Sequence, residues 1–219
     1  MEEYNTIRYE IKDKVATIQL NRPDAYNTFT PEMNHEITSA LKHAEKRKDV
    51  RSIVITGVGK AFSAGQDLKA IEPDIDFGEF LRNNYHPMIQ TLRSMSKPTV
   101  AAVNGVAAGA GMSLALATDF RIIHSDAKFV IAFLGIALVP DAGFMYILPR
   151  LVGYAKAIEI LTVREQITSE EAFQLGLATE VIDANEWDVK VARFANKLAS
   201  LPPKAFALVK RYMGESMNV

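Results

Sequence analysis

The chain has 219 residues, of which 48% are hydrophobic, with 25 basic residues against 26 acidic ones. This length is enough for one well-buried α/β core with at most a small appendage, so no second independent domain is required. The near-neutral charge gives no electrostatic footprint for nucleic acid or for an anionic membrane surface. The absence of cysteine excludes disulfides, thiolate catalysis and cysteine-based metal sites, and it fits a reducing compartment.

The N-terminus has neither a basic region nor an apolar run of the kind that marks a secretory signal, so we expect a cytoplasmic protein. The four histidines are scattered without metal-ligand spacing, and no metal site is expected. Residues 100–117 carry no charge, yet they contain Asn104 and three glycines. They therefore predict a strand, a turn, a glycine-rich loop and a helix start rather than a membrane span.

In the first half of the chain, apolar runs predict strands at residues 15–20, 51–56 and 99–103. The first strand ends at the turn signal of residues 21–24. Thr30 and Pro31 form an N-cap pair that opens a helix. A polar region at residues 72–76 precedes a second helix, which runs through residues 85–95.

In the second half, residues 120–123 and 129–131 predict two more strands, and Pro140-Asp141 predicts a helix start that leads toward Leu148. Residues 168–171 form a capping box before a helix that ends near Gly176. A strand at residues 178–182 and helices at residues 186–198 and 203–213 follow. Repeated strand-then-helix units predict an α/β fold with a largely parallel sheet.

Two loops rich in small residues follow apolar strands, at residues 60–68 (KAFSAGQDL) and 104–111 (NGVAAGAG). Glycine and alanine let a ligand approach the main chain, and N–H groups fixed on strand-to-helix turns stabilise a negative charge as it forms. The phosphate-binding alternative is weak, because residues 57–62 lack the third glycine of the dinucleotide motif and no P-loop motif occurs.

Several motifs in order along the chain resemble those of the enoyl-CoA hydratase/isomerase family, also called the crotonase family. They are Asn21-Arg22-Pro23, the two loops, Pro140-Asp141-Ala142-Gly143 and Leu175-Gly176-Leu177-Ala178. The resemblance implies an α/β ββα spiral core over residues 1–184 and a C-terminal helical segment over residues 185–219. It also implies that this segment takes part in a homotrimer or dimer of trimers. Members of the family usually continue through further helices after the position that corresponds to Val219.

The resemblance further implies an acyl-CoA thioester as substrate, with no redox or metal cofactor. By motif position, the main-chain N–H groups of Gln66 and Ala110 would bind the thioester oxygen. Other positions would line the path of the CoA or the acyl group, namely Ala25, Ala64, Gly65, Asp67, Leu68, Gly109, Ser113 and Phe133. Asp67 and Asp119 are expected to be structural, capping main-chain N–H groups at turns.

The residues at the acid and base positions bear on the reaction. Ser113 and Phe133 stand where the hydratases of the family carry two glutamates, and neither is a useful acid or base near neutral pH. Asp141 is the better candidate, since its apolar neighbours could raise its pKa toward that of a useful base. From the residues alone, the favoured interpretation is an N-cap aspartate that only satisfies helix amides, and the family resemblance reverses this preference.

Relatives that shift double bonds often carry an acidic residue at the position of Asp141, and the loops are most similar to those of the epoxyphenylacetyl-CoA isomerase group of phenylacetate breakdown. Phe144 stands where many relatives have glycine. We therefore expect an acyl-CoA isomerase in which Asp141 moves the proton. The alternatives are an enoyl-CoA hydratase and a non-catalytic acyl-CoA-binding or RNA-binding homologue.

Overall fold

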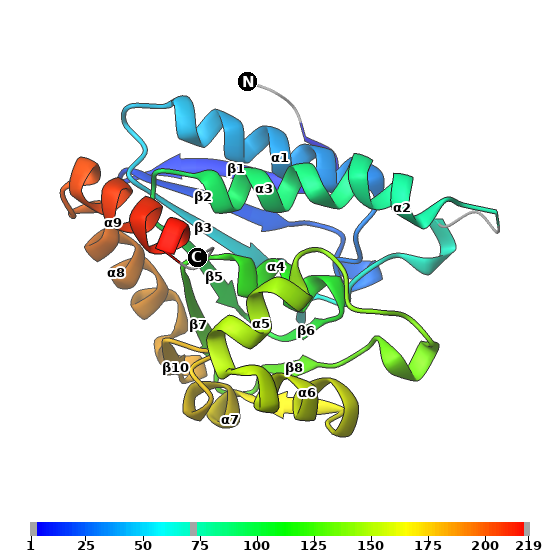
Figure 1. The fold of residues 1–219 in the computed structure, drawn as a ribbon. Coiled ribbons are helices and arrows are strands. Elements are labelled where there is room, and N and C mark those ends of the chain that lie inside the picture. Colours follow the sequence, from blue (N-terminus) through cyan, green and yellow to red (C-terminus); the bar gives the residue numbers. More distant parts are fainter. Residues whose placement is uncertain (1–3, 71–73, 217–219) are drawn as a thin grey trace.

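The computed structural model describes residues 4–70 and 74–216, and Figure 1 shows its arrangement. Ten strands in this part of the chain form two sheets. The larger sheet has six strands in the order β1-β2-β3-β5-β7-β10, and the smaller one has four in the order β4-β6-β8-β9. The strands of the larger sheet are β1 (Ile7–Lys12), β2 (Val15–Leu20), β3 (Ser52–Gly57), β5 (Thr99–Val103), β7 (Phe120–His124) and β10 (Glu180–Ile182). The smaller sheet consists of β4 (Ala61–Ser63), β6 (Val106–Ala108), β8 (Lys128–Val130) and β9 (Gln166–Thr168).

The chain builds these sheets by repeating one unit. Each of β3, β5 and β7 in the larger sheet leads into β4, β6 and β8 of the smaller one, and a helical segment then returns to the larger sheet or onward. The neighbours in the larger sheet are parallel except β1 and β2, and those in the smaller sheet are parallel except β8 and β9. The predicted ββα spiral with a largely parallel sheet is therefore confirmed.

The helices surround this pair of sheets: α1 and α3, which lie side by side, pack with α4 on one face of the larger sheet, and α8 packs on the other face (Figure 1). The helices are α1 (Pro31–Lys46), α2 (Phe77–Phe80), α3 (His86–Ser94), α4 (Ala110–Ala117), α5 (Phe144–Val152), α6 (Tyr154–Val163), α7 (Ser169–Gln174), α8 (Trp187–Ala199) and α9 (Pro203–Ser216). Short turns complete the list, namely the 3-10 turns η1 (Pro23–Ala25), η2 (Leu68–Ala70), η4 (Leu134–Ile136) and η5 (Ala184–Glu186), and the π-helical turn η3 (Leu81–Tyr85).

Alternation along the strands divides the core between the two faces of the larger sheet. Ile53 and Ile55 pack into the main cluster with α1, α3 and α4, whereas Val54 packs into a second cluster with α8. Successive side chains of a strand point to opposite faces, so one apolar strand serves both clusters. This explains why the central strands are apolar at nearly every position, as a strand covered on both faces must be.

Several local predictions are confirmed. Thr30 caps α1 by accepting from the Met33 N–H at 3.2 Å. Thr168 and Glu171 form the predicted capping box of α7. The uncharged residues 100–117 divide into β5, β6 and α4, and in the described ranges no helix is long and apolar enough to span a bilayer.

Other predictions are wrong or incomplete. Pro140-Asp141 does not open a helix, because α5 begins at Phe144 with Gly143 as its N-cap. Strands β1, β4, β6 and β9 and helix α6 were not predicted. Part of the polar region predicted at residues 72–76 lies outside the described residues.

Helix α4 passes so close to β4 that no side chain fits between them. A Cβ added to Gly111 would lie 2.4 Å from the Ser63 carbonyl oxygen and 2.8 Å from the Ser63 Cβ. All eight residues of α4 are buried, so neither segment can move outward into solvent. The position of α4 against the smaller sheet therefore depends on a glycine at residue 111.

We expect Gly111→Ala to destabilise the fold by about 1–3 kcal/mol, because the methyl group would force two packed segments apart. Gly214→Ala is the matched control, since nothing lies within 4 Å of a Cβ at Gly214 in α9. Alanine is the better helix former, so the control should leave stability unchanged or raise it by up to about 1 kcal/mol. Urea midpoints measure both, and a Gly111→Ala protein as stable as the control would contradict the close approach.

Candidate active site

The first loop rich in small residues runs from the end of β4 into η2. Phe29 pairs with Gln66 in a parallel bridge, in which the Phe29 N–H donates to Gly65 O at 2.8 Å and the Asp67 N–H donates to Phe29 O at 3.0 Å. In an extended chain successive amides point to opposite sides, so the Gln66 N–H points away from Phe29. Gly65, at φ +93°, adopts a backbone conformation that side chains rarely permit.

The second loop leads from β6 into α4, whose first residue is Ala110. Gly109 is the N-cap at φ +48°, and no side chain caps the helix. A first-turn N–H has no acceptor within its own helix, and the N-terminus carries partial positive charge. The Ala110 N–H is therefore a donor available to a ligand, presented from a buried helix.

The structure brings the two loops together, as predicted. Strand β4 pairs in parallel with β6, with Ser63 opposite Ala107. A Cβ on Gly65 would lie 2.9 Å from Ala108 O and 3.5 Å from Ala110 N. The main chain before Gln66 therefore lies directly against the start of α4, and the Gln66 and Ala110 amides belong to one small region.

The residues predicted to line the CoA path gather along the first loop. The Ala64 N–H donates to Tyr26 O at 2.9 Å, which places the turn containing Ala25 beside Ala64. Ala64 and Leu68 are exposed, whereas Gly65 is buried. The predicted positions thus form an open rim that leads toward the buried loop glycine.

Asp67 is structural, as expected, although it belongs to this rim. Its Oδ2 accepts from Arg22 Nη2 at 3.0 Å, and its Oδ1 accepts from the Lys69 N–H at 3.2 Å. The hydrogen bond from Arg22 lowers the pKa of the carboxyl, with burial acting in the opposite direction. Asp119 is similarly engaged, since its Oδ2 accepts from the Thr99 N–H and from Lys210 Nζ.

Ser113 and Phe133 lie around the second loop. Ser113 is fully buried, with its Oγ 3.3 Å from Gly109 O and 3.4 Å from Asp141 O. The Phe133 ring packs on Phe144, with centroids 5.3 Å apart, and its Cε1 would lie 4.0 Å from a Cβ on Gly109. The serine hydroxyl thus faces main-chain carbonyls, and an aromatic ring forms the wall beside the loop.

Asp141 lies in the loop between η4 and α5, and the N-cap interpretation of this residue is wrong. Gly143 holds the N-cap position, and Asp141 contributes only its carbonyl oxygen, which accepts from the Phe144 N–H at 2.9 Å. The Asp141 Oδ1 is buried and finds no hydrogen-bond partner among the described residues. Burial raises the pKa of the Asp141 carboxyl, while its own main-chain N–H and His86 offset part of that rise.

Tyr85 also contacts this region, and no local sequence pattern marks it as a site residue. Its hydroxyl donates to Gln66 Oε1 at 2.6 Å. Burial raises the pKa of Tyr85, and the negative charge of Asp141 adds to that rise. The candidate site therefore combines two main-chain donors, one buried carboxyl group and a buried tyrosine bonded to the Gln66 side chain.

Comparisons with known proteins agree with this geometry. The model of the enoyl-CoA hydratase/isomerase family matches residues 10–218. A probable enoyl-CoA hydratase of Rhodobacter capsulatus is 43% identical over 95% of this chain and 80% of its own length. The 1,2-epoxyphenylacetyl-CoA isomerase of Escherichia coli is 36% identical over 92% of this chain and 79% of its own length.

Solved structures show the same fold. The crystal structure of an enoyl-CoA hydratase from Mycobacterium avium subsp. paratuberculosis superimposes with a TM-score of 0.90 at 30% identity, over 99% of this chain and 87% of that one. An enoyl-CoA hydratase structure from Bacillus anthracis gives a TM-score of 0.91 at 30% identity, over 98% and 84%. By sequence and by fold, the chain belongs to the enoyl-CoA hydratase/isomerase family.

Proposed function

We propose that the protein is an acyl-CoA isomerase that shifts a double bond or rearranges the acyl group through a thioester enolate. Asp141 takes a proton from a carbon next to the thioester carbonyl, and the electron pair left behind moves onto the carbonyl oxygen. The N–H groups of Gln66 and Ala110 stabilise that oxygen. Asp141 then returns the proton to another carbon, and no water or cofactor is consumed.

The observation that carries this proposal is the state of the Asp141 carboxyl group. Its Oδ1 is buried and has no hydrogen-bond partner among the described residues, and burial raises the pKa of the carboxyl group. A carboxylate that the protein leaves unsatisfied is costly unless a ligand uses it. A raised pKa also improves a carboxylate as a base, because it narrows the gap to the acidity of the carbon.

The two loops supply the other half of the mechanism. One oxyanion donor is typically worth about 3 kcal/mol of the barrier, which corresponds to a few hundredfold in rate. The Gln66 N–H is directed away from Phe29 by the bridge, and the Ala110 N–H has no acceptor within α4. Both donors are main-chain groups, one held by the bridge to Phe29 and the other at the start of a buried helix, so little reorganisation is needed as the charge forms.

The hydratase alternative depends on a group that activates water. Ser113 directs its hydroxyl at main-chain carbonyls, and Phe133 presents a ring packed on Phe144. Neither position offers a carboxylate to hold water opposite Asp141, which favours isomerisation. The relatives bear both names, hydratase and isomerase, and ¹⁸O from labelled water in the product would identify a hydratase.

The non-catalytic alternative predicts acyl-CoA binding without turnover. The near-neutral charge of the chain does not support RNA binding. The absence of cysteine fits a reducing compartment, and the cytoplasm is the proposed location.

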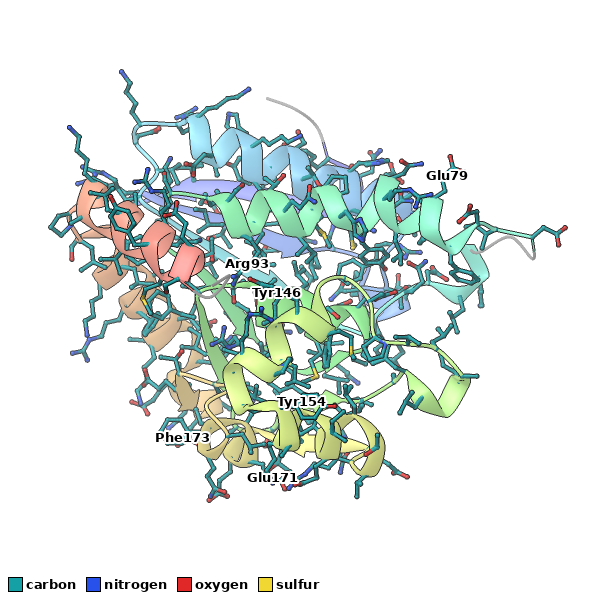
Figure 2. The ribbon with its side chains drawn as sticks, viewed as in Figure 1. Glu79, Arg93, Tyr146, Tyr154, Glu171 and Phe173 are labelled. Carbon is teal, nitrogen blue, oxygen red and sulfur yellow. The ribbon has the colours of Figure 1, made fainter. Side chains whose placement is uncertain are left out.

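The C-terminal helices support the proposed homotrimer or dimer of trimers. In α8, Leu198 is buried against the sheet, but Val189 is 72% exposed, and Leu208 in α9 is 45% exposed. Tyr154 of α6 and Phe173 of α7 also project at the surface on one side of the molecule (Figure 2). Exposed apolar side chains of this number are typical of a surface that another subunit covers.

We expect Asp141→Asn to lower isomerase turnover on a panel of unsaturated acyl-CoA thioesters by about a hundredfold or more, because the shape is kept and the proton acceptor is removed. Binding of a saturated acyl-CoA should change little. Asp126→Asn is the control, since this aspartate is exposed in the turn between β7 and β8. An Asp141→Asn protein that is folded and fully active would refute the mechanism.

The pH dependence should report the same carboxyl group. The acid limb of the kcat/KM profile should lie above the ~3.9 of an unperturbed aspartate, because the base must be ionised and its pKa is raised. A raised pKa in the folded state also means that ionised Asp141 destabilises the fold at neutral pH. This cost disappears as the pH falls from the raised pKa of the folded state to the ordinary aspartate pKa of the unfolded state. Asp141→Asn should therefore raise the melting temperature at pH 7 but not at pH 3, and equal effects at both pH values would contradict the raised pKa.

Sedimentation velocity at micromolar concentration tests the assembly. The expected species is a trimer or hexamer, because the exposed apolar residues of α6 to α9 need a partner surface. A Val189→Lys variant in α8 should weaken association, whereas Lys190→Gln, at its neighbour, serves as the control. A monomeric wild-type protein at all concentrations would contradict the assembly.

A further inference from the structure

We propose that Tyr85 is a positioning residue of the active site, which fixes Gln66 so that the Gln66 main-chain N–H faces the thioester oxygen. This proposal rests on the oxyanion role proposed above for Gln66. The proposal gives Tyr85, which lies in the turn η3 between α2 and α3, a part in the function of the loop at residues 60–68.

Every polar atom of the Gln66 side chain is used inside the protein. Oε1 accepts from the Tyr85 hydroxyl at 2.6 Å, while Nε2 donates to Phe29 O at 3.2 Å and to Asp67 O at 3.0 Å. The last two bonds are local to the bridge between Phe29 and the loop. Of the three side-chain bonds of Gln66, the bond from Tyr85 is the one that reaches the turn η3.

Three bonds on a short amide group hold the Gln66 side chain in a single rotamer. The backbone conformation at Gln66 is then constrained twice. The bridge to Phe29 holds the main chain, and the bond from Tyr85 holds the side chain. Rotation about the Gly65–Gln66 segment would break the bridge, the Tyr85 bond or both. Gly65, at φ +93°, gives the loop more conformational freedom than another residue would. The bond from Tyr85 to the Gln66 side chain limits that freedom at the next residue.

Tyr85 itself is rigidly placed. It is 1% exposed, and its ring meets Phe29 edge-on at 6.0 Å between centroids and Phe80 at 6.1 Å. Phe29 thus contacts both members of the pair, since it bridges to Gln66 and packs on Tyr85. A buried tyrosine hydroxyl needs a hydrogen-bond partner, and Oε1 of the Gln66 side chain accepts from it.

The backbone around Tyr85 is irregular in a way that suits this task. Tyr85 is the last residue of the π-helical turn η3, between α2 and α3. Such turns insert one residue into a helix, change the direction of the side chains that follow, and occur often at functional sites. Burial and the charge of Asp141 raise the pKa of Tyr85, so it remains a donor at any pH at which the enzyme would work.

The test compares Tyr85→Phe, which removes only the hydroxyl, with Tyr9→Phe as the matched control. The Tyr9 hydroxyl, on β1, hydrogen-bonds with Nδ1 of the exposed His43 in α1 at 3.0 Å, and neither residue belongs to the two loops. The first readout is the infrared carbonyl stretch of a bound ¹³C-labelled butyryl-CoA, a saturated thioester that cannot isomerise. An oxyanion donor lowers that frequency, and a purely structural role of Tyr85 would leave it unchanged.

In the wild type and in Tyr9→Phe, the bound carbonyl should absorb at lower frequency than in free butyryl-CoA. In Tyr85→Phe a measurable part of that shift should be lost. The kcat for isomerisation should fall about tenfold, as expected for one lost hydrogen bond, while KM changes less than twofold. A full shift together with an unchanged kcat in folded Tyr85→Phe would overturn the proposal.

A double-mutant cycle keeps the test independent of folding effects at Tyr85. Gln66→Leu removes the acceptor and leaves the tyrosine intact, so Tyr85→Phe should cause no further loss of kcat in its presence. Additive losses would show that Tyr85 acts by another route and would also overturn the proposal. Absence of any carbonyl shift in the wild type would instead refute the oxyanion role of Gln66, which distinguishes failure of the proposed function from failure of this inference.

Discussion

The contact between β4 and the first turn of α4 is the constraint on which the active region depends. Gly111 lies against the Ser63 carbonyl, and Gly65 lies against Ala108, at distances that leave no room for a Cβ. Two main-chain segments can approach this closely only where side chains are absent. The approach puts the N-terminus of a fully buried helix beside an extended loop, and it does so through the packing of the core rather than through flexible side chains.

That constraint determines what the rest of the structure must supply. The smaller sheet holds β4 and β6 in register, and the larger sheet supports both through β3 and β5, which precede them in the chain. Phe29 links the first loop to Tyr85 by one bridge and one ring contact. The carboxyl group of Asp141 comes from a third segment, whose conformation depends on left-handed residues at Ala142 and Gly143.

The sequence predicted the elements that have strong patterns. The apolar runs of β2, β3, β5 and β7 and the caps of α1 and α7 follow directly from composition and spacing. Strand β1 has the same kind of pattern, since Ile7, Tyr9 and Ile11 alternate with polar residues, and this alternation is enough to predict a strand. Strands β4, β6 and β9 are no shorter than β8 and β10, but their residues lie within glycine-rich or polar stretches that are typical of loops.

Sequence patterns indicate those parts of the candidate site that are local in the chain, and they do not indicate the parts that tertiary packing brings together. Main-chain donors at glycine-rich turns are visible in sequence, but Pro140-Asp141 signals a turn as well as a helix start, and only the fold decides between them. Tyr85 is 19 residues from Gln66 and ends a π turn that breaks the helical period. A contact of this kind results from tertiary packing, so no window along the chain contains it.

The division of the active region among separate turns of the spiral has an evolutionary consequence. The main-chain donors proposed to polarise the thioester follow the first two ββ units, where Gly65 and Gly111 leave no room for a side chain. Asp141, Ser113 and Phe133 lie on α4 or beyond it and contribute side chains. We therefore expect exchange of side chains at these later positions to change the reaction while the proposed main-chain donors stay in place.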